Sequence, residues 1–356
     1  MKVLFVARRF PPSIGGMQKF AYDLSRALPE ENVELVKVTW GGSNIWLPVV
    51  LPWLFARGLW ALLSDRSIDV IHIQDAVLSP LGWLLSKLSR RPWIVVAHGL
   101  DLTFKLAFYQ KVNLFFARRC GAMIAISQAT ADEATKRGVP DKKVTVIPLG
   151  VSQDKTPNIN RPKLLASAGI AKDAEILITV GRLAKRKGVA WFVTDVLPQI
   201  SGDEHYVVIG EGVERGNIER AVEKHDQAAR VHLLGEVDDS TKQAWLSAAD
   251  IFVMPNITVP GDMEGFGIVA HEAAMAELPV VASNIEGIAQ ALQDGENGIL
   301  LQEKDAKAYQ GTIEELLSDD KKRQALGRQA RKYTLNTFGW SKIAQQYKDT
   351  YQKVIS

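Results

Sequence analysis

Short apolar runs rich in Val and Ile recur along the chain with helical segments between them, and this recurrence restricts the fold more than any other feature. Each run is mostly continuous rather than alternating, which is typical of strands in a parallel sheet with both faces buried. Six runs in each half predict an α/β protein with two doubly wound, Rossmann-like parallel-sheet domains. The runs are Val3–Ala7, Glu34–Thr39, Val70–Ile73, Ile94–Ala97, Met123–Ile126, Val144–Ile147, Ile176–Val180, Tyr206–Ile209, Val231–Leu234, Ile251–Met254, Pro279–Ala282 and Gly298–Leu301.

The length and one polar segment indicate where the two domains meet. At 356 residues the chain is longer than one hydrophobic core usually fills. Residues 150–162 are polar, contain two Pro and show no periodicity, so they form the best linker. We therefore expect an N-terminal domain over 1–155 and a C-terminal domain over 163–337. Apolar residues at helical spacing in residues 338–356 predict an amphipathic helix. Their pattern does not identify the domain that this helix covers, and we expect it to pack on the N-terminal domain.

Cysteine content and charge distribution bound the location and the partners. A single cysteine, Cys120, cannot form an internal disulfide, and the first apolar run is too short for a signal peptide, which favours the cytoplasm. Residues 1–150 hold 19 Lys and Arg against 11 Asp and Glu, whereas the remaining residues hold 24 against 29. The basic first half favours an anionic partner such as a membrane surface, a phosphorylated acceptor or nucleic acid. Ordinary variation of surface charge explains the same asymmetry.

Residues 264–272, EGFGIVAHE, place Glu264 and Glu272 around a glycine pair. Gly265 and Gly267 leave backbone N–H groups open to close approach, and the helical composition that follows predicts a helix from residue 268. The N–H groups and the dipole at the start of that helix favour a phosphate. The two carboxylates would then serve hydroxyl groups, because Glu accepts hydrogen bonds from a sugar and repels phosphate. The alternative is a glycine-capped helix with two surface Glu.

A second candidate segment, residues 181–188 with the sequence GRLAKRKG, puts four cations in a strand-to-helix turn. Ligands of open α/β sheets bind beyond the carboxyl ends of the strands. A diphosphate held without a metal needs such cations, with Arg as a bidentate fork and Lys as a point charge. Arg182 and Lys187 are the best candidates for this role. The alternative is a solvated basic loop.

Two segments of the first half also follow strand ends. Gly15 and Gly16 precede a helix, so that a ligand can approach its N–H groups closely. His98 comes directly after a strand and before Gly99, where its ring would point toward a ligand. If the carboxyl ends of the two sheets face each other, all these groups line one interdomain cleft. An ordinary glycine turn and a structural histidine are the alternatives.

Several common sites are excluded by their missing motifs. There is no HExxH motif and no Cys cluster, so we predict no metal site. Residues 210–216, GEGVERG, resemble the dinucleotide fingerprint, but the third Gly comes one position late, which disfavours a nicotinamide enzyme. No GxxxxGK[ST] motif and no Asp-x-Asp motif occur.

The most apolar segment, residues 45–63, contains three Trp with two Pro and Arg57, which argue against a transmembrane helix. Buried core is one interpretation. The other is a surface that dips into a bilayer together with residues 104–119, which end in two Arg. The basic excess of the first half supports the second interpretation.

Taken together, these segments resemble retaining glycosyltransferases of the GT-B fold in the large family four group, which includes bacterial mannosyl- and glucosyltransferases. The resemblance extends over nearly the whole chain and rests on several matches in the right order. They are the early Gly-Gly loop, His98-Gly99, Ser127, Gly181-Arg182, Lys187-Gly188 and the Glu-x7-Glu pair. The sequence departs from many relatives at His271, where an aliphatic residue is common.

The resemblance implies roles for individual residues. Arg182 and Lys187 would hold the donor diphosphate, Glu272 the ribose hydroxyls and Glu264 the donor sugar, with His98 near the reacting carbon. The further contacts would come from the backbone N–H groups of Gly265, Phe266 and Gly267, and from Gly15 and Gly16, which would border the donor phosphate and the acceptor.

The expected function is transfer of a hexose from a UDP- or GDP-linked sugar to a lipid-linked or membrane-proximal glycan acceptor, without a cofactor or metal. The anomeric configuration would be retained, and cations and N–H groups would stabilise the leaving diphosphate. We expect a cytoplasmic protein, peripheral on the inner face of the cytoplasmic membrane, with no nucleic acid partner. The alternatives are a GT-B sugar phosphorylase, a nucleotide-sugar epimerase, or a non-catalytic membrane- or glycan-binding protein.

Overall fold

The computed structural model describes residues 1–13, 15–103, 107–152, 159–262, 264, 266–285 and 287–356, which form two compact units. The first unit comprises Met1–Ser152 and Phe338–Ser356, and the second Gln153–Thr337. Each unit contains one six-stranded sheet, and every strand pairs in parallel with its neighbours. The predicted pair of parallel doubly wound sheets is therefore confirmed.

The sheet of the first unit has the strand order β2-β1-β3-β4-β5-β6. Its strands are β1 (Lys2–Ala7), β2 (Glu34–Thr39), β3 (Val70–Ile73), β4 (Trp93–Ala97), β5 (Ala122–Ala125) and β6 (Val144–Val146). Its helices are α1 (Gly16–Glu30), α2 (Leu47–Ser64), α3 (Ser79–Ser89), α4 (Leu100–Thr103), α5 (Ala107–Ala117), α6 (Gln128–Lys136) and α15 (Trp340–Ile355). The strand order reverses between β1 and β3, where ligands of such sheets bind.

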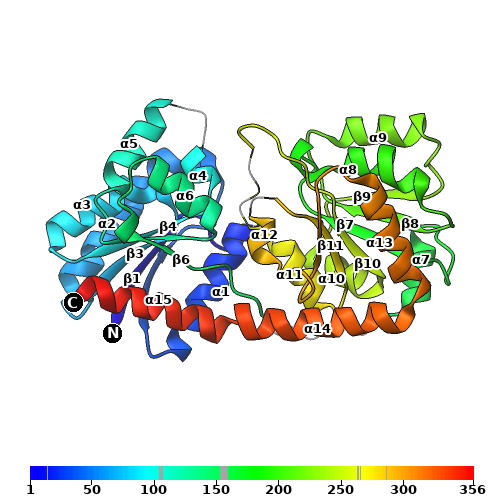
Figure 1. The fold of residues 1–356 in the computed structure, drawn as a ribbon. Coiled ribbons are helices and arrows are strands. Elements are labelled where there is room, and N and C mark those ends of the chain that lie inside the picture. Colours follow the sequence, from blue (N-terminus) through cyan, green and yellow to red (C-terminus); the bar gives the residue numbers. More distant parts are fainter. Residues whose placement is uncertain (14, 104–106, 153–158, 263, 265, 286) are drawn as a thin grey trace. The chain divides into compact units, whose positions relative to one another are not determined.

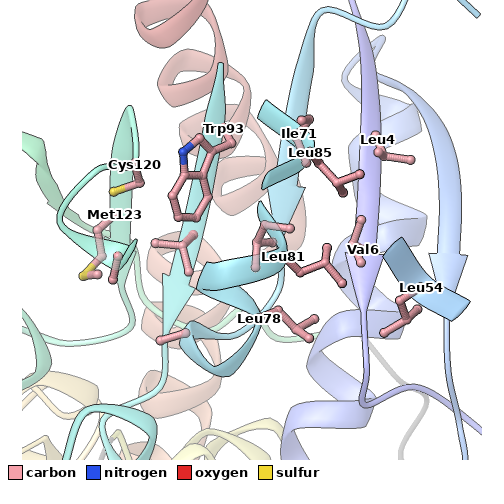
Figure 2. Packing of buried hydrophobic residues seen from close by; sticks show 14 of the residues in the cluster. Leu4, Val6, Leu54, Ile71, Leu78, Leu81, Leu85, Trp93, Cys120 and Met123 are labelled. Atoms are coloured by element: carbon pink, nitrogen blue, oxygen red, sulfur yellow. The ribbon is translucent and has the colours of Figure 1, made fainter. Parts of the chain in front are cut away.

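One face of this sheet is covered by α2, α3 and α5 (Figure 1). Figure 2 shows Leu4 and Val6 of β1 and Ile71 of β3 packing with Leu54 of α2 and Leu85 of α3. All five side chains are fully buried, and each stabilises the unit by roughly 1.5–3 kcal/mol relative to an exposed side chain.

The opposite face is covered by α1 and by α15, the last helix of the chain (Figure 1). The predicted amphipathic tail helix is present, with Ile343, Tyr347 and Tyr351 fully buried. Trp340 at its start stacks on Phe20 of α1, with ring centroids 5.6 Å apart. The C-terminal residues thus complete the core of the first unit.

The sheet of the second unit has the strand order β12-β11-β10-β7-β8-β9. Its strands are β7 (Ile176–Val180), β8 (His205–Ile209), β9 (Val231–Gly235), β10 (Ile251–Met254), β11 (Val280–Ser283) and β12 (Ile299–Leu301). Its helices are α7 (Arg161–Ser167), α8 (Val189–Trp191), α9 (Arg215–Lys224), α10 (Asp239–Ala248), α11 (Ile268–Met275), α12 (Ile288–Ala291), α13 (Ala306–Ser318) and α14 (Asp320–Phe338). Here the order reverses between β7 and β10.

The tryptophan-rich segment forms α2, which begins after a 3₁₀ turn at Asn44–Trp46. By length and composition α2 could cross a membrane, yet Val50, Leu54 and Leu62 are buried on the sheet. Trp46, Trp53 and Trp60 are exposed, so the interpretation of these three as core is wrong. Of the second segment proposed to touch a membrane, residues 104–106 lie outside the described residues, and Phe115 is exposed.

Candidate active site

The cationic turn after β7 is pressed against the segment that follows β10. Gly188 has φ 66°, and a Cβ there would come within 1.8 Å of the carbonyl oxygen of Pro255, so only glycine fits. The N–H of Ile257 donates to the carbonyl oxygen of Arg186 at 2.8 Å. Both contacts hold the short helix η4 (Lys185–Lys187) at the point where the strand order reverses.

Beside this turn, Glu264 lies at the centre of a buried cluster of charged side chains. Its Oε2 is 2.7 Å from Nζ of Lys187 and 3.4 Å from Nε of Arg186, and it accepts a hydrogen bond from Asn256 Nδ2 at 3.2 Å. Burial acts to raise the pKa of Glu264, but the two cations and the hydrogen bonds from Lys187 and Asn256 outweigh it and hold the pKa below its usual value. Arg186 also pairs with Asp262, at 2.9 Å. Glu264 is therefore ionised at neutral pH.

Glu272 is positioned by α11, which begins after Gly267 in a left-handed conformation (φ 71°). Its carboxylate lies 3.0 Å from Nζ of Lys242 on α10. Burial acts to lower the pKa of Lys242, but Glu272, with help from Asp239, raises it overall. The carboxylate is thus fixed in place and mostly buried, just over one turn into the helix.

His271 points into the core of the second unit. Its ring is fully buried, donates from Nε2 to the carbonyl oxygen of Ala291 at 2.8 Å, and meets the ring of Phe266 edge-on at 5.1 Å. Burial lowers the pKa of His271 to about 4, so the ring is neutral. This histidine anchors α11 to the segment at Ala291, where an aliphatic residue could only fill space.

The structure brings together only some of the residues that were predicted to form the site in the second unit. Lys187 and Glu264 are brought together, whereas Arg182 is exposed in the same turn. Gly265 lies outside the described residues. Arg186, Asn256 and Lys242 complete the charge clusters and were missed by sequence reasoning, although Arg186 belongs to the cationic run.

In the first unit, His98 is held at the carboxyl end of β4. Its Nε2–H donates to the carbonyl oxygen of Gln74 at 2.9 Å, and its backbone N–H donates to Oδ1 of Asp101 at 2.9 Å. The other oxygen of Asp101 accepts from the N–H of Ala76 at 3.1 Å. Burial raises the pKa of Asp101. The ring orientation of His98 is therefore set by the segment that follows β3.

A buried polar chain connects that segment to the C-terminal helix. His72 of β3 contacts Oε1 of Gln74 through Nε2 at 2.6 Å and the hydroxyl of Tyr351 through Nδ1 at 2.7 Å. Because Gln74 Oε1 can only accept, Nε2 carries the proton and Nδ1 accepts from Tyr351. Burial lowers the pKa of His72 to about 3, so this ring is neutral.

Gly15 and Gly16 lie at the start of α1, as predicted. A Cβ at Gly16 would meet no atom of the described residues within 4 Å, so the space that they leave beside this glycine is open. Nearby along the same sheet edge, Arg8 pairs with Asp75 at 3.0 Å, and both side chains are buried. The first unit therefore presents an open helix start together with a fixed imidazole.

Comparison with known proteins agrees with this arrangement. Residues 160–333 match the family of glycosyl transferases group 1, and residues 14–155 match glycosyltransferase family 4. These matches cover almost the whole chain, and the protein belongs to the family 4, group 1 glycosyltransferases with the GT-B fold.

Three relatives show how far the likeness extends. An uncharacterised glycosyltransferase of Methanocaldococcus jannaschii is 25% identical, over 99% of this chain and 98% of the relative. A phosphatidyl-myo-inositol mannosyltransferase of Mycobacterium leprae is 28% identical, over 82% of this chain and 75% of the relative. The structure of Anabaena HepE in complex with UDP-glucose superposes with a TM-score of 0.77, 20% identity and 99% coverage of both chains.

Proposed function

We propose that the protein transfers a hexose from a UDP- or GDP-linked sugar to a lipid-linked or membrane-proximal glycan acceptor, with retention of the anomeric configuration. The buried contact between Lys187 and Glu264 carries this proposal, because it places a cation for a diphosphate beside a carboxylate for sugar hydroxyls. The UDP-glucose bound by HepE supports a nucleotide-sugar donor. The phosphatidyl-myo-inositol mannosyltransferase among the relatives, together with the exposed Trp side chains of α2, supports an acceptor at a membrane.

The residues of the second unit would act on the donor. Lys187 and the exposed Arg182 would bind the diphosphate, and Glu272 would accept hydrogen bonds from the ribose. Negative charge grows on the diphosphate as it leaves, and these cations with the N–H groups at the start of α11 would stabilise it without a metal. Glu264, ionised beside Lys187, would hold the hydroxyls of the sugar.

The residues of the first unit would act on the sugar and the acceptor. His98, whose Nε2–H is already engaged by Gln74, has its ring direction fixed before any substrate binds. Gly15 and Gly16 would let the acceptor and the donor phosphate approach the start of α1. We place the protein in the cytoplasm, peripheral on the inner face of the membrane.

The decisive experiment measures release of nucleoside diphosphate from a panel of nucleotide sugars, with a lipid extract as acceptor and with and without EDTA. Release from one donor, unaffected by EDTA, is expected, and NMR of the product should show the donor's anomeric configuration. Arg182→Gln should reduce turnover by at least 10-fold, since a hydrogen bond from a charged group contributes about 1.5–3 kcal/mol. The matched control is Lys185→Gln, an exposed cation of the same turn.

Other outcomes would assign the site differently. Turnover that needs inorganic phosphate would indicate a phosphorylase, and an isomerised nucleotide sugar without acceptor an epimerase. Failure to release diphosphate from any donor, or full activity of Arg182→Gln, would contradict the proposal.

A further inference from the structure

A basic groove lies at the other edge of the first sheet, away from His98 and Gly16. Its volume is about 1070 Å³, and it opens at the amino ends of β4 and β5. The walls come from the end of α3, the turn after α5, Lys143 before β6 and the end of α15, while Trp93 and Cys120, labelled in Figure 2, lie at its base. Among the described residues, six cations line this basic groove and no carboxylate does; the cations are Lys87, Arg90, Arg91, Arg118, Arg119 and Lys143.

None of these six cations has an acidic partner among the described residues. Arg91 donates to the carbonyl oxygen of Arg66, and Arg118 to that of Arg137. Lys143 donates to the carbonyl oxygen of Cys120 at 2.8 Å, and the guanidinium of Arg119 lies 3.5 Å from the ring centroid of Phe115. Positive charges gathered in this way repel one another until an anion binds.

Apolar side chains stand exposed around the same groove. Leu88 of α3 is 55% exposed, Phe115 of α5 50%, and Ile355 at the end of α15 42%. Helices α2, α3 and α5, which together form one layer on the sheet (Figure 1), contain no Asp and no Glu. Soluble surfaces mix charges of both signs, whereas cations alternating with apolar groups suit the surface of an anionic bilayer.

We propose that the basic groove binds phospholipid phosphates at the surface of an anionic bilayer, while Leu88, Phe115 and Ile355 enter the headgroup region. A second copy of the chain fits less well, because two such grooves facing each other would bring twelve cations together. The inference rests on the proposed function in one respect, since the proposed acceptor brings the protein close to a membrane. Because the groove lies at the amino ends of the strands, lipid bound there leaves His98 and the start of α1 accessible.

The test is flotation of the full-length protein with vesicles of phosphatidylcholine alone or mixed equally with phosphatidylglycerol, at low and high salt. We expect binding only to the anionic vesicles, weakened by salt. Lys87→Gln combined with Arg90→Gln should lower the partition coefficient about 25-fold, at roughly 5-fold for each cation removed. Both side chains are exposed and form no hydrogen bond or ion pair with the described residues, so folding should be unaffected.

The matched control is Lys321→Gln combined with Arg328→Gln, two exposed cations of α14, which should float like the parent. Equal binding to neutral vesicles, or an equal loss in both double variants, would overturn the proposal. The proposal would also be overturned if the protein bound single-stranded DNA and not the vesicles. It would equally be overturned if the protein dimerised through this surface, seen as a molecular mass that doubles as the protein concentration rises. Diphosphate release with a soluble acceptor is measured on the same variants, so that a failure of catalysis is distinguished from a failure of lipid binding.

Discussion

Replacing Glu264 by Gln should destabilise the ligand-free second unit while making it respond more strongly to a nucleoside diphosphate. The substitution leaves Lys187, which is 7% exposed, without its carboxylate. Gln can keep the hydrogen bond from Asn256, and Arg186 keeps Asp262 at 2.9 Å. One buried cation therefore loses its partner, so the cost lies at the lower end of the usual range, about 3 kcal/mol.

For a unit of this size, 1 kcal/mol moves the unfolding midpoint by about 2–4 °C, so we expect a fall of about 6–12 °C. A bound diphosphate would supply Lys187 with a new negative charge. Its stabilising effect should thus be larger in Glu264→Gln than in the parent. Differential scanning calorimetry with and without the nucleotide measures both quantities.

A matched double variant separates the ion pair from other effects of the substitution. In Lys187→Met with Glu264→Gln no charge is left unpaired, and most of the lost stability should return. The diphosphate should stabilise this double variant less than either the parent or the single variant. The reasoning is refuted if Glu264→Gln unfolds within about 2 °C of the parent, or if the nucleotide shifts both proteins equally.

Replacing Glu272 by Gln should weaken nucleoside diphosphate binding by at least 10-fold, because a charged hydrogen bond to the ribose is worth about 1.5–3 kcal/mol; unchanged affinity by calorimetric titration would contradict this role. The pKa of His271, about 4 when folded and about 6.5 when unfolded, gives stability that is present above pH 6.5 and lost as the pH falls toward 4. The parent should therefore lose about 2 kcal/mol of its free energy of unfolding between about pH 7.5 and 5, and His271→Leu should not show this loss. Equal losses in both proteins, measured by denaturant unfolding, would disprove it. Tyr351→Phe should lower the free energy of unfolding by about 1–3 kcal/mol, and it should lower kcat more than KM because His98 is held less firmly. The control is Tyr347→Phe, which should be neutral because the buried hydroxyl of Tyr347 has no partner among the described residues. Equal effects of the two variants would rule out a role of Tyr351 in positioning His98.

The sequence sufficed for the features that repeat along the chain. Continuous Val- and Ile-rich runs located the strands within a residue or two, and the helix predicted to begin at residue 268 is observed as α11. Lys187 and Glu264 could be singled out because each stands beside a glycine at a strand or helix end.

Pairings between distant side chains could not be predicted in the same way. Lys242 precedes Glu272 by thirty residues, and their contact depends on how α10 and α11 pack on the sheet. The same holds for His72 and Tyr351, which meet only because α15 returns to the first unit. Nor does the basic run itself show that Arg186 is buried while Arg182 is exposed. The contacts of Arg186 with Ile257, Asp262 and Glu264 are made with the segment that follows β10, some seventy residues further along the chain.

The return of α15 to the first unit has a consequence for how the protein is made. A domain at the start of a chain usually folds while the rest is still being synthesised. Here the face of the first sheet that carries His72, on which Phe20 of α1 packs, lacks Tyr347 and Tyr351 until they leave the ribosome, after every residue of the second unit. Until then the part of this face that α15 covers is open to solvent, so we expect the nascent first unit to be prone to aggregation and to depend on chaperones.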